Sequence, residues 1–149
     1  MTSSILEVNS LSKKYSEIGY VVKDMSFSVG QGQVFGILGP NGSGKTTTLS
    51  IILDVVRASS GGYSWFQKGD HPRYRQNIGA LLDIPSFFPW LTIEKYLMHW
   101  AKMKSINNPS KRVDDLLELT GLSSVRTTRL NNASLGMKQR FGIACALVH

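Results

Sequence analysis

Cysteine, acidic residues and long apolar runs are all scarce in this sequence of 149 residues. Its one cysteine, Cys145, has no partner for a disulfide within the chain, which fits a reducing compartment. The most apolar stretch, residues 49–56, is interrupted by Asp54 and falls short of the roughly 18 residues that cross a bilayer. The first residues lack the basic start and apolar core of a secretory signal. We therefore expect neither a disulfide-stapled secreted domain nor a membrane-spanning chain.

The shortage of acidic residues leaves a net charge of +7, from 17 Lys and Arg against 10 Asp and Glu. A basic balance suits nucleic acid, an acidic membrane surface or a polyphosphate. The basic residues are scattered and are not interleaved with aromatic residues, so we expect no nucleic-acid partner. The histidines, His71, His99 and His149, have no metal-ligand spacing. The length and the 42% hydrophobic content are ordinary for one soluble globular domain.

Short apolar patterns predict strands in the first half of the chain. These segments are residues 5–11, 23–29, 34–38, 63–66 and 78–82. The first two alternate apolar and polar residues, as half-buried strands do, whereas residues 34–38 form a continuous apolar run typical of a buried parallel strand. Apolar residues between positions 49 and 56 recur at helical spacing, so a helix is predicted there.

From residue 85 onward the patterns are helical. Thr92 is the predicted N-cap of a helix that runs to about residue 103. A second helix is predicted at residues 111–120, with Gly121 at the left-handed position that follows it. Residues 131–134 precede a last apolar helix that reaches the end of the sequence without a Gly, Pro or polar cluster behind it. Because most domains do not finish in this way, we interpret the sequence as a domain cut short.

The strongest motif is the loop Gly39-Pro40-Asn41-Gly42-Ser43-Gly44-Lys45-Thr46, which satisfies the pattern G-x-x-x-x-G-K-S/T. Its glycines let the backbone turn tightly and bring N–H groups against phosphate oxygens. Lys45 supplies a charge between the β- and γ-phosphates, and the Thr46 hydroxyl suits Mg²⁺, which prefers oxygen ligands. A helix beginning near Gly44 directs its positive dipole end at the anion. The alternative is a glycine-rich turn with a solvated lysine, but the predicted strand before it and helix after it favour a site for MgATP.

A second segment separates the classes of protein that share such a loop: Ala133-Ser134-Leu135-Gly136-Met137-Lys138-Gln139-Arg140. With residues 39–47 it resembles the ATP-binding subunit of an ABC transporter, and the resemblance covers essentially the whole chain. Ser134 and Gly136 match the serine and second glycine of the family's L-S-G-G-Q signature. Leu135 and Met137 depart from it. The form S-L-G-M-K-Q-R, with residues 78–83 and 87–92, resembles the branch that exports bacitracin, lantibiotics and similar peptides.

The resemblance implies an α/β fold of the P-loop NTPase class, with an antiparallel β part, a partial parallel core sheet and a helical subdomain. It implies one incomplete domain in which residues 1–83 form the β part and P-loop core, and residues 84–149 form the helical subdomain that ends in the signature helix. It also implies ATP and Mg²⁺ as cofactors, a membrane-spanning permease as partner, and a peripheral location on the cytoplasmic face of the cell membrane. A head-to-tail dimer is implied, in which Ser134 and Gly136 face the γ-phosphate held by the partner's loop.

The resemblance also implies further site residues. Tyr15 matches the aromatic residue that stacks on adenine, although a Tyr at a strand end is as often ordinary packing. Thr47 extends the phosphate-binding segment. Asp83 occupies the position of a family glutamine or glutamate. It is a candidate ligand of Mg²⁺ or water beside Thr46 and a candidate catalytic residue beside Lys45, with a solvated loop aspartate as the alternative.

An aromatic loop follows, and its four bulky residues are costly to expose together: Phe87, Phe88, Pro89 and Trp90. Clustered surface aromatics often mark an interface, and in the resembling family this region faces the permease. Packing into a small core is the alternative interpretation.

We interpret the chain as the N-terminal portion of an ATPase that drives export of a peptide antibiotic or similar substrate. Water would attack the γ-phosphate in line, while Lys45 and Mg²⁺ offset charge. In the family the Walker B aspartate and the catalytic glutamate come shortly after the segment that ends at His149, so we expect the isolated chain to be poorly stable and to have negligible turnover. A non-hydrolysing nucleotide-binding fragment or regulatory module is the alternative. A small-molecule kinase is a third hypothesis, which the segment 134–140 disfavours.

Overall fold

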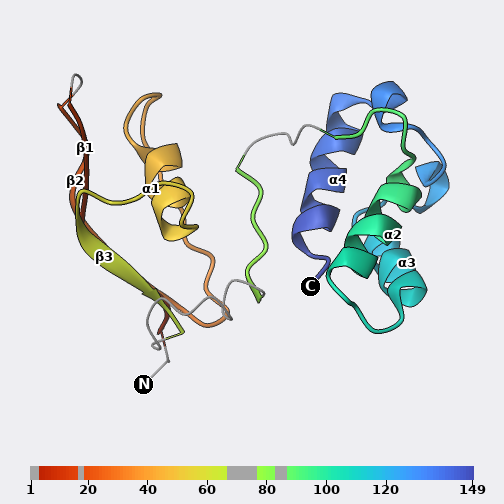
Figure 1. The fold of residues 1–149 in the computed structure, drawn as a ribbon, viewed down its shortest axis with the longest axis horizontal. Coiled ribbons are helices and arrows are strands. Elements are labelled where there is room, and N and C mark those ends of the chain that lie inside the picture. The colour runs from red at the N-terminus through yellow and green to blue at the C-terminus, as the bar shows by residue number, and fades with distance from the viewer. Residues whose placement is uncertain (1–3, 17–18, 67–76, 83–86) are drawn as a thin grey trace. The chain divides into compact units, whose positions relative to one another are not determined.

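The computed structural model describes residues 4–16, 19–66, 77–82 and 87–149 (Figure 1). The chain divides by its internal contacts into two compact units, Met1–Arg75 and Gln76–His149. Each unit has its own hydrophobic core. The assignment of residues 1–83 and 84–149 to functional subdomains stays a prediction.

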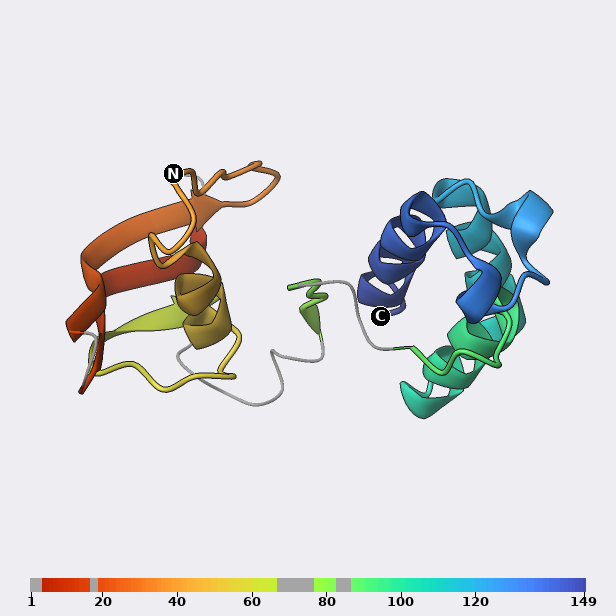
Figure 2. The same cartoon turned by 90° about the horizontal axis from the view of Figure 1, so that it is seen from above.

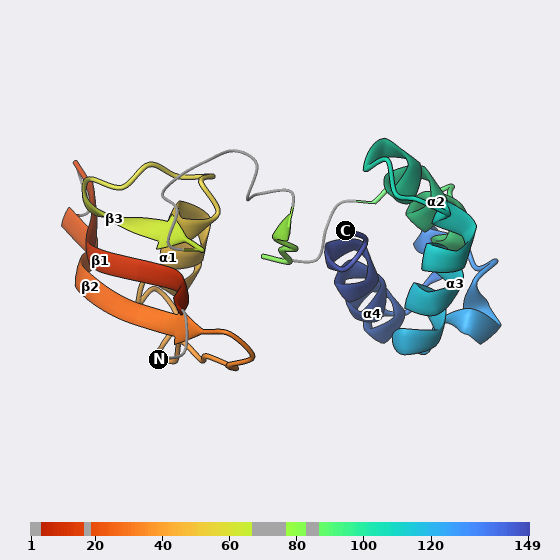
Figure 3. The ribbon, with the colours of Figure 1, turned by 90° about the horizontal axis from the view of Figure 1, so that it is seen from below.

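The first unit is built on a three-stranded antiparallel sheet, in the order β2-β1-β3. The strands are β1 (Ser4–Tyr15), β2 (Gly19–Gly30) and β3 (Ser60–Trp65). Strand β1 is central, so that Leu6 lies opposite Val29 on β2 and opposite Trp65 on β3. Helix α1 (Lys45–Ile52) covers one face of the sheet (Figures 2 and 3). The alternation at residues 5–11 and 23–29 therefore predicted both long strands.

The core of this unit lies between the sheet and α1. It consists of five buried residues: Leu6, Val8, Leu11, Ile51 and Ile52. The β1 residues come from alternate positions until a register shift between Val8 and Leu11. Because burial of one such side chain stabilises a fold by about 1.5–3 kcal/mol, these five residues are enough to fix α1 on the sheet.

The prediction of a buried parallel strand at residues 34–38 is wrong for this structure. This segment forms no strand, and the side chains of Val34 and Leu38 are 99% and 94% exposed. Only Phe35 finds a partner ring, stacking on Phe27 of β2 with centroids 4.8 Å apart. A parallel strand needs a neighbouring strand for its backbone hydrogen bonds. None of the described residues supplies one, and so the expected parallel core sheet is absent from the described part of the chain.

Residues 78–82 were also predicted to form a strand and do not. Within the second unit, the backbone at Gly79 packs against the Ala146 carbonyl so closely that a Cβ atom has no room. Leu81 packs on Gly142, which lies in the same helix as Ala146. Leu81 and Leu82 remain 40% and 38% exposed, so this segment contacts the helix without strand pairing and without full burial.

The second unit is helical (Figure 1). It contains α2 (Ile93–Met103), α3 (Pro109–Leu119) and α4 (Leu135–Ala146), with short 3₁₀ turns η2 (Ser123–Val125) and η3 (Leu130–Asn132) between α3 and α4. The predicted caps are confirmed. Thr92 Oγ1 accepts a hydrogen bond from the Lys95 N–H at 3.3 Å, and Gly121 follows α3 with a φ of +65°. No helix among the described residues is both long and apolar enough to cross a membrane.

The helical core is larger than the core of the first unit. Its fully buried side chains include Ile93, Leu97, Val113, Leu116, Leu117, Leu122 and Phe141. Cys145 packs against this cluster, and burial raises the pKa of its thiol to about 12. A thiol with so high a pKa is an inert small hydrophobe at neutral pH, because the thiolate is the reactive form.

Candidate nucleotide-binding site

The glycine-rich loop joins the exposed segment 34–38 to α1. Its three glycines have positive φ angles, +157° at Gly39, +82° at Gly42 and +88° at Gly44. A turn is closed by the Ser43 N–H, which donates to the Pro40 carbonyl at 3.2 Å. Gly44 is pressed against β2, where an added Cβ atom would lie 2.5 Å from the Val21 carbonyl oxygen. Glycine is therefore required at position 44 both for its φ angle and for the close approach to the sheet.

The loop leaves a set of backbone donors unused. The N–H groups of Gly42, Gly44, Lys45 and Thr46 form no hydrogen bond with any described residue. Further into α1, the hydroxyl of the buried Thr48 donates to the Gly44 carbonyl at 2.9 Å and so leaves these amides free. Gly44 is also the N-cap of α1 and has no side chain to satisfy the first turn. Free amides at the positive end of a helix favour an anion.

Lys45 spans the start of the loop. Its Nζ donates to the Gly39 carbonyl at 2.8 Å and to the Pro40 carbonyl at 2.7 Å. An ammonium group has three donors, so one remains for a ligand while the other two fix the charge in place. The Thr46 side chain is exposed in the first turn of α1, and its neighbour Thr47 is partly buried. The loop thus combines free amides, a fixed cation and an exposed hydroxyl.

Tyr15 lies at the end of β1 and is 39% exposed. It pairs with Gly19, while Lys13 pairs with Val22. Gly44 contacts the backbone of β2 at Val21, so Tyr15 and the loop lie at the same end of the β1–β2 pair. Sequence reasoning overlooked a further contact here: Lys13 Nζ lies 4.8 Å from the centre of the Tyr15 ring. Residues two apart on a strand share a face, and this spacing is the signal that predicts the contact.

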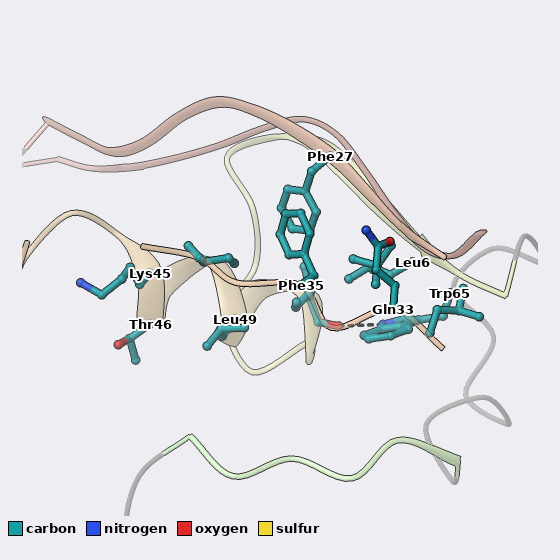
Figure 4. Close-up of a pocket in the computed structure, with 12 residues that line it drawn as sticks. Leu6, Phe27, Gln33, Phe35, Lys45, Thr46, Leu49 and Trp65 are labelled. Atoms are coloured by element: carbon teal, nitrogen blue, oxygen red, sulfur yellow. Dashed lines mark hydrogen bonds between the residues drawn. The ribbon is translucent and has the colours of Figure 1, made fainter. Parts of the chain in front are cut away.

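An apolar groove of about 570 Å³ runs between the sheet and α1 (Figure 4). Its walls are mainly aromatic and aliphatic, with Phe27, Phe35 and Trp65 among them. Lys45 and Thr46 lie at one end, and their polar atoms point away from the apolar side chains (Figure 4). Such a lining does not suit a triphosphate, because charged phosphate oxygens would lose their hydration without gaining polar partners. The loop amides, and not this groove, are the candidate phosphate site.

The predicted signature residues lie at the start of α4, in the second unit. Ser134 is its N-cap, and its Oγ accepts a hydrogen bond from the Met137 N–H at 3.3 Å. The Lys138 N–H donates to the Ser134 carbonyl at 2.9 Å. The N–H groups of Leu135 and Gly136 have no hydrogen-bond partner among the described residues. The serine therefore caps α4 and leaves two amides free, as an anion site requires. Asp83, the remaining candidate, lies outside the described residues.

The aromatic loop divides between core and surface. Phe87 packs inward, with its ring centre 4.6 Å from that of Phe141 and 5.8 Å from that of Tyr96. Phe88 and Trp90 are 50% and 65% exposed, and their ring centres are 5.4 Å apart. The core-packing interpretation is therefore confirmed for Phe87, whereas Phe88 and Trp90 form an exposed aromatic pair for which the interface interpretation stays a prediction.

Comparison with known proteins places this site in a family. The family model described as ABC transporter matches residues 22–149. An ABC transporter ATP-binding protein of Bacillus subtilis (strain 168), YdbJ, is 38% identical over 153 aligned positions that take in 100% of this chain and 49% of that protein. The bacitracin transport ATP-binding protein BcrA of Bacillus licheniformis is 34% identical, over 99% of this chain and 48% of BcrA. The chain thus spans about half the length of the curated relatives it matches.

Solved structures agree with the sequence relatives. An ATP binding subunit of an ABC transporter superposes with a TM-score of 0.81 at 29% identity, covering 97% of this chain and 62% of the other. CbiO1 from Clostridium perfringens, part of the ABC transporter complex CbiONQ, superposes with a TM-score of 0.83 at 27% identity, covering 98% of this chain and 62% of CbiO1. With its phosphate loop, its capped signature helix and these relatives, the chain belongs to the ABC transporter family of ATP-binding proteins.

Proposed function

We propose that the chain binds MgATP through residues 39–46, as the nucleotide-binding part of an ABC transporter. The observation that carries this proposal is a set of four amides, without a partner among the described residues, around a lysine whose ammonium is already fixed by Gly39 and Pro40. Backbone amides donate hydrogen bonds to the α- and β-phosphate oxygens, and the third donor of Lys45 contacts the β- and γ-phosphates. The other cofactor-binding residues that we propose lie between Asn41 and Thr47 and form the rest of the loop around the phosphates.

Magnesium fits the same site through its chemistry. Mg²⁺ prefers oxygen ligands and keeps several waters, so it needs few protein ligands. The exposed Thr46 hydroxyl, in the first turn of α1, is such a ligand, and Asp83 is the second that we propose. When bound, the ion neutralises phosphate charge. Lys45 also neutralises phosphate charge. Tyr15 holds the adenine ring by stacking, because its partly exposed side chain lies at the same end of the sheet as the loop.

The start of α4 is proposed as the second phosphate contact. The free Leu135 and Gly136 amides above the Ser134 cap suit the γ-phosphate of a nucleotide held by another ATPase subunit. This arrangement is a head-to-tail dimer, since each subunit then offers a loop to one nucleotide and a signature helix to the other. Each triphosphate would then lie between two helix starts with free amides, that of α1 in one subunit and that of α4 in the other.

The exposed pair Phe88 and Trp90 is the proposed contact with a membrane-spanning permease. Aromatic residues are enriched at protein interfaces, and the loop behind this pair is held rigid. The Leu130 N–H donates to the Leu91 carbonyl at 2.9 Å, and the Asn131 N–H to the Pro89 carbonyl at 3.0 Å. With BcrA as a relative, we propose export of a peptide antibiotic or similar substrate, by a protein held at the cytoplasmic face of the membrane.

For the whole protein we propose ATP hydrolysis coupled to transport. For the 149-residue chain by itself we propose binding with negligible turnover, which is also what a non-hydrolysing module would show. The residues described here suit binding and orientation of the triphosphate, and Asp83, which lies outside them, is the catalytic residue that we propose beside Lys45.

Titration of the purified chain with a fluorescent ATP analogue, with and without Mg²⁺, tests the proposal. We expect magnesium-dependent binding that is weakened at least about tenfold by Lys45→Ala, because the fixed cation is lost. Lys23→Ala, on β2, is the matched control for loss of one positive charge. Unchanged affinity in the Lys45 variant would contradict the proposal. Phosphate release by the wild-type chain that is lost in the same variant would contradict the binding-only part of it.

A further inference from the structure

We infer that Lys13 is a positioning residue that holds Tyr15 as the stacking platform for adenine. This inference rests on the proposed function and adds a residue to it. Lys13 and Tyr15 project from the same face of β1, and the Lys13 ammonium lies 4.8 Å from the centre of the Tyr15 ring. That distance is within the roughly 6 Å range of a cation–π contact.

The Lys13 ammonium also has a second, independent partner. Its Nζ donates to the Arg57 carbonyl at 2.8 Å, in the segment that follows α1. Two further bonds close the same junction: the Ser59 N–H donates to the Ser12 carbonyl at 2.9 Å, and the Lys14 N–H to Ser59 Oγ at 3.0 Å. These bonds connect the strand end that carries Tyr15 to the segment that follows α1. Lys13 adds its charge and its hydrogen bond to that connection.

Part of the Tyr15 side chain is open to a ligand. Tyr15 is 39% exposed, and among the described residues its ring has no contact with another ring or with another cation. A cation on one face of a ring draws electron density from it, which strengthens stacking of an electron-rich base on the opposite face. The geometry therefore suits a flat, electron-rich heteroaromatic ring such as adenine, in line with the triphosphate at the loop.

The neighbouring pair provides a matched comparison. Lys14 Nζ lies 5.7 Å from the centre of the Tyr20 ring, and Tyr20 is 57% exposed. The Lys14 ammonium donates no hydrogen bond to the described residues, so nothing else holds it over its ring. Both lysines carry one charge and sit next to each other on β1. Of the two side chains, that of Lys13 lies closer to its ring, and only its ammonium donates a hydrogen bond to the segment after α1.

Calorimetric titration with two ligands, MgATP and magnesium tripolyphosphate, tests the inference. The second ligand has the phosphates without the base. We expect Lys13→Met to weaken MgATP binding about two- to five-fold, the value of one exposed cation–π contact, and to leave tripolyphosphate binding unchanged. Lys13→Arg should restore MgATP affinity, because a guanidinium also binds ring faces. Lys14→Met, the matched control, should leave both affinities unchanged.

The ratio of the two dissociation constants is the deciding number, since a smaller folded fraction lowers the amount of active protein for both ligands alike. In a Tyr15→Leu background the Lys13→Met substitution should change this ratio no further, because the platform is already gone. An unchanged ratio for Lys13→Met, or an equal change for Lys14→Met, overturns the inference and leaves the proposed function standing. A wild-type chain that binds neither ligand overturns the proposed function itself.

Discussion

Helices α1 and α2 begin in opposite ways. The start of α1 is capped by a glycine without a side chain, and its first amides have no described partner. The start of α2 is sealed: the Ile93 and Glu94 N–H groups donate to the carbonyls of Thr128 and Arg126 at 3.1 Å, and Thr92 caps the next amide. The same backbone end thus suits ligand binding where it is left open and adds stability where it is closed.

Helix α4 lies between these extremes. Its Ser134 satisfies one amide, and two others stay free. The sealed start of α2 is reinforced by charge, since Arg126 contacts both Glu94 and Asp114 at 2.7 Å. These two hydrogen bonds raise the pKa of Arg126, which keeps the guanidinium charged at every accessible pH. The comparison predicts that changes at α1 act mainly on nucleotide affinity, and that changes at α2 act only on stability.

The largest effect is expected from Gly44→Ala. The methyl group would meet the Val21 carbonyl oxygen at 2.5 Å, and the φ of +88° is strained for alanine. We expect a loss of about 3 kcal/mol in the free energy of unfolding and at least about tenfold weaker MgATP binding. Gly42→Ala is the control, because Gly42 has a similar φ of +82° but no atom within 4 Å of an added Cβ. It should lose only about 1 kcal/mol, from the φ angle alone.

Urea unfolding and fluorescent-nucleotide titration of both glycine variants measure these effects. Equal losses of stability in the two variants would show that the contact with β2 does not hold the loop in place. Equal nucleotide affinity of Gly44→Ala and the wild-type chain would show that the start of α1 does not contribute to nucleotide binding.

A smaller effect is expected from Thr92→Ala at the sealed end. Loss of the Thr92 cap on the Lys95 N–H should lower the free energy of unfolding by about 1 kcal/mol, the usual value of a helix cap. MgATP affinity should stay unchanged. Thr127→Ala, at an exposed position without a cap, is the control for the lost hydroxyl and methyl groups. The same titrations apply, and a change in nucleotide affinity in the Thr92 variant would break the division between open and sealed ends.

Ser134→Ala is expected to cost less than Thr92→Ala. The two cap bonds have the same length, 3.3 Å, but the start of α2 has further backbone bonds that depend on its geometry. We expect a loss of about 0.5 kcal/mol in urea unfolding, at the low end for a serine cap. Ser124→Ala, in the exposed turn η2, is the control. A loss larger than that of Thr92→Ala would mean that the Ser134 cap is mainly a stability device.

The local features of the fold were accessible from the sequence. Thr92, Ser134 and Gly121 were predicted as helix boundaries because a cap depends on a few adjacent residues. The glycine spacing of residues 39–46 likewise predicted a turn entering a helix, since only glycine tolerates those φ angles.

Features that depend on distant partners were not accessible. An apolar run such as residues 34–38 becomes a strand only beside another strand, and its sequence does not contain that neighbour. The carbonyls of Arg126 and Thr128 that seal α2 come from 32 to 35 residues further along the chain, as the 94–126 and 93–128 pairs show. The contact between Lys13 and Tyr15 follows a strand rule but also requires side-chain conformations that the pattern does not specify.

The smallest effect is expected at Cys145, near the end of α4, and it follows from pH. Burial raises the pKa of its thiol from 9.0 to about 12 in the folded chain. Between these values the unfolded chain loses the proton and the folded chain keeps it. The contribution of the thiol to stability is therefore complete well below pH 9, begins to fall as the pH approaches 9, and is lost as the pH rises toward 12. Between pH 8 and pH 9 we expect a decrease of about 0.4 kcal/mol in the free energy of unfolding, from the linkage relation.

Cys145→Ala should abolish this part of the pH dependence in urea unfolding, because other titrating groups are common to both chains. Because this thiol lies at the opposite end of α4 from Ser134, an unchanged pH profile in the Cys145→Ala variant would mean that the end of the helix opens before the chain unfolds, and that the two ends of α4 differ in stability.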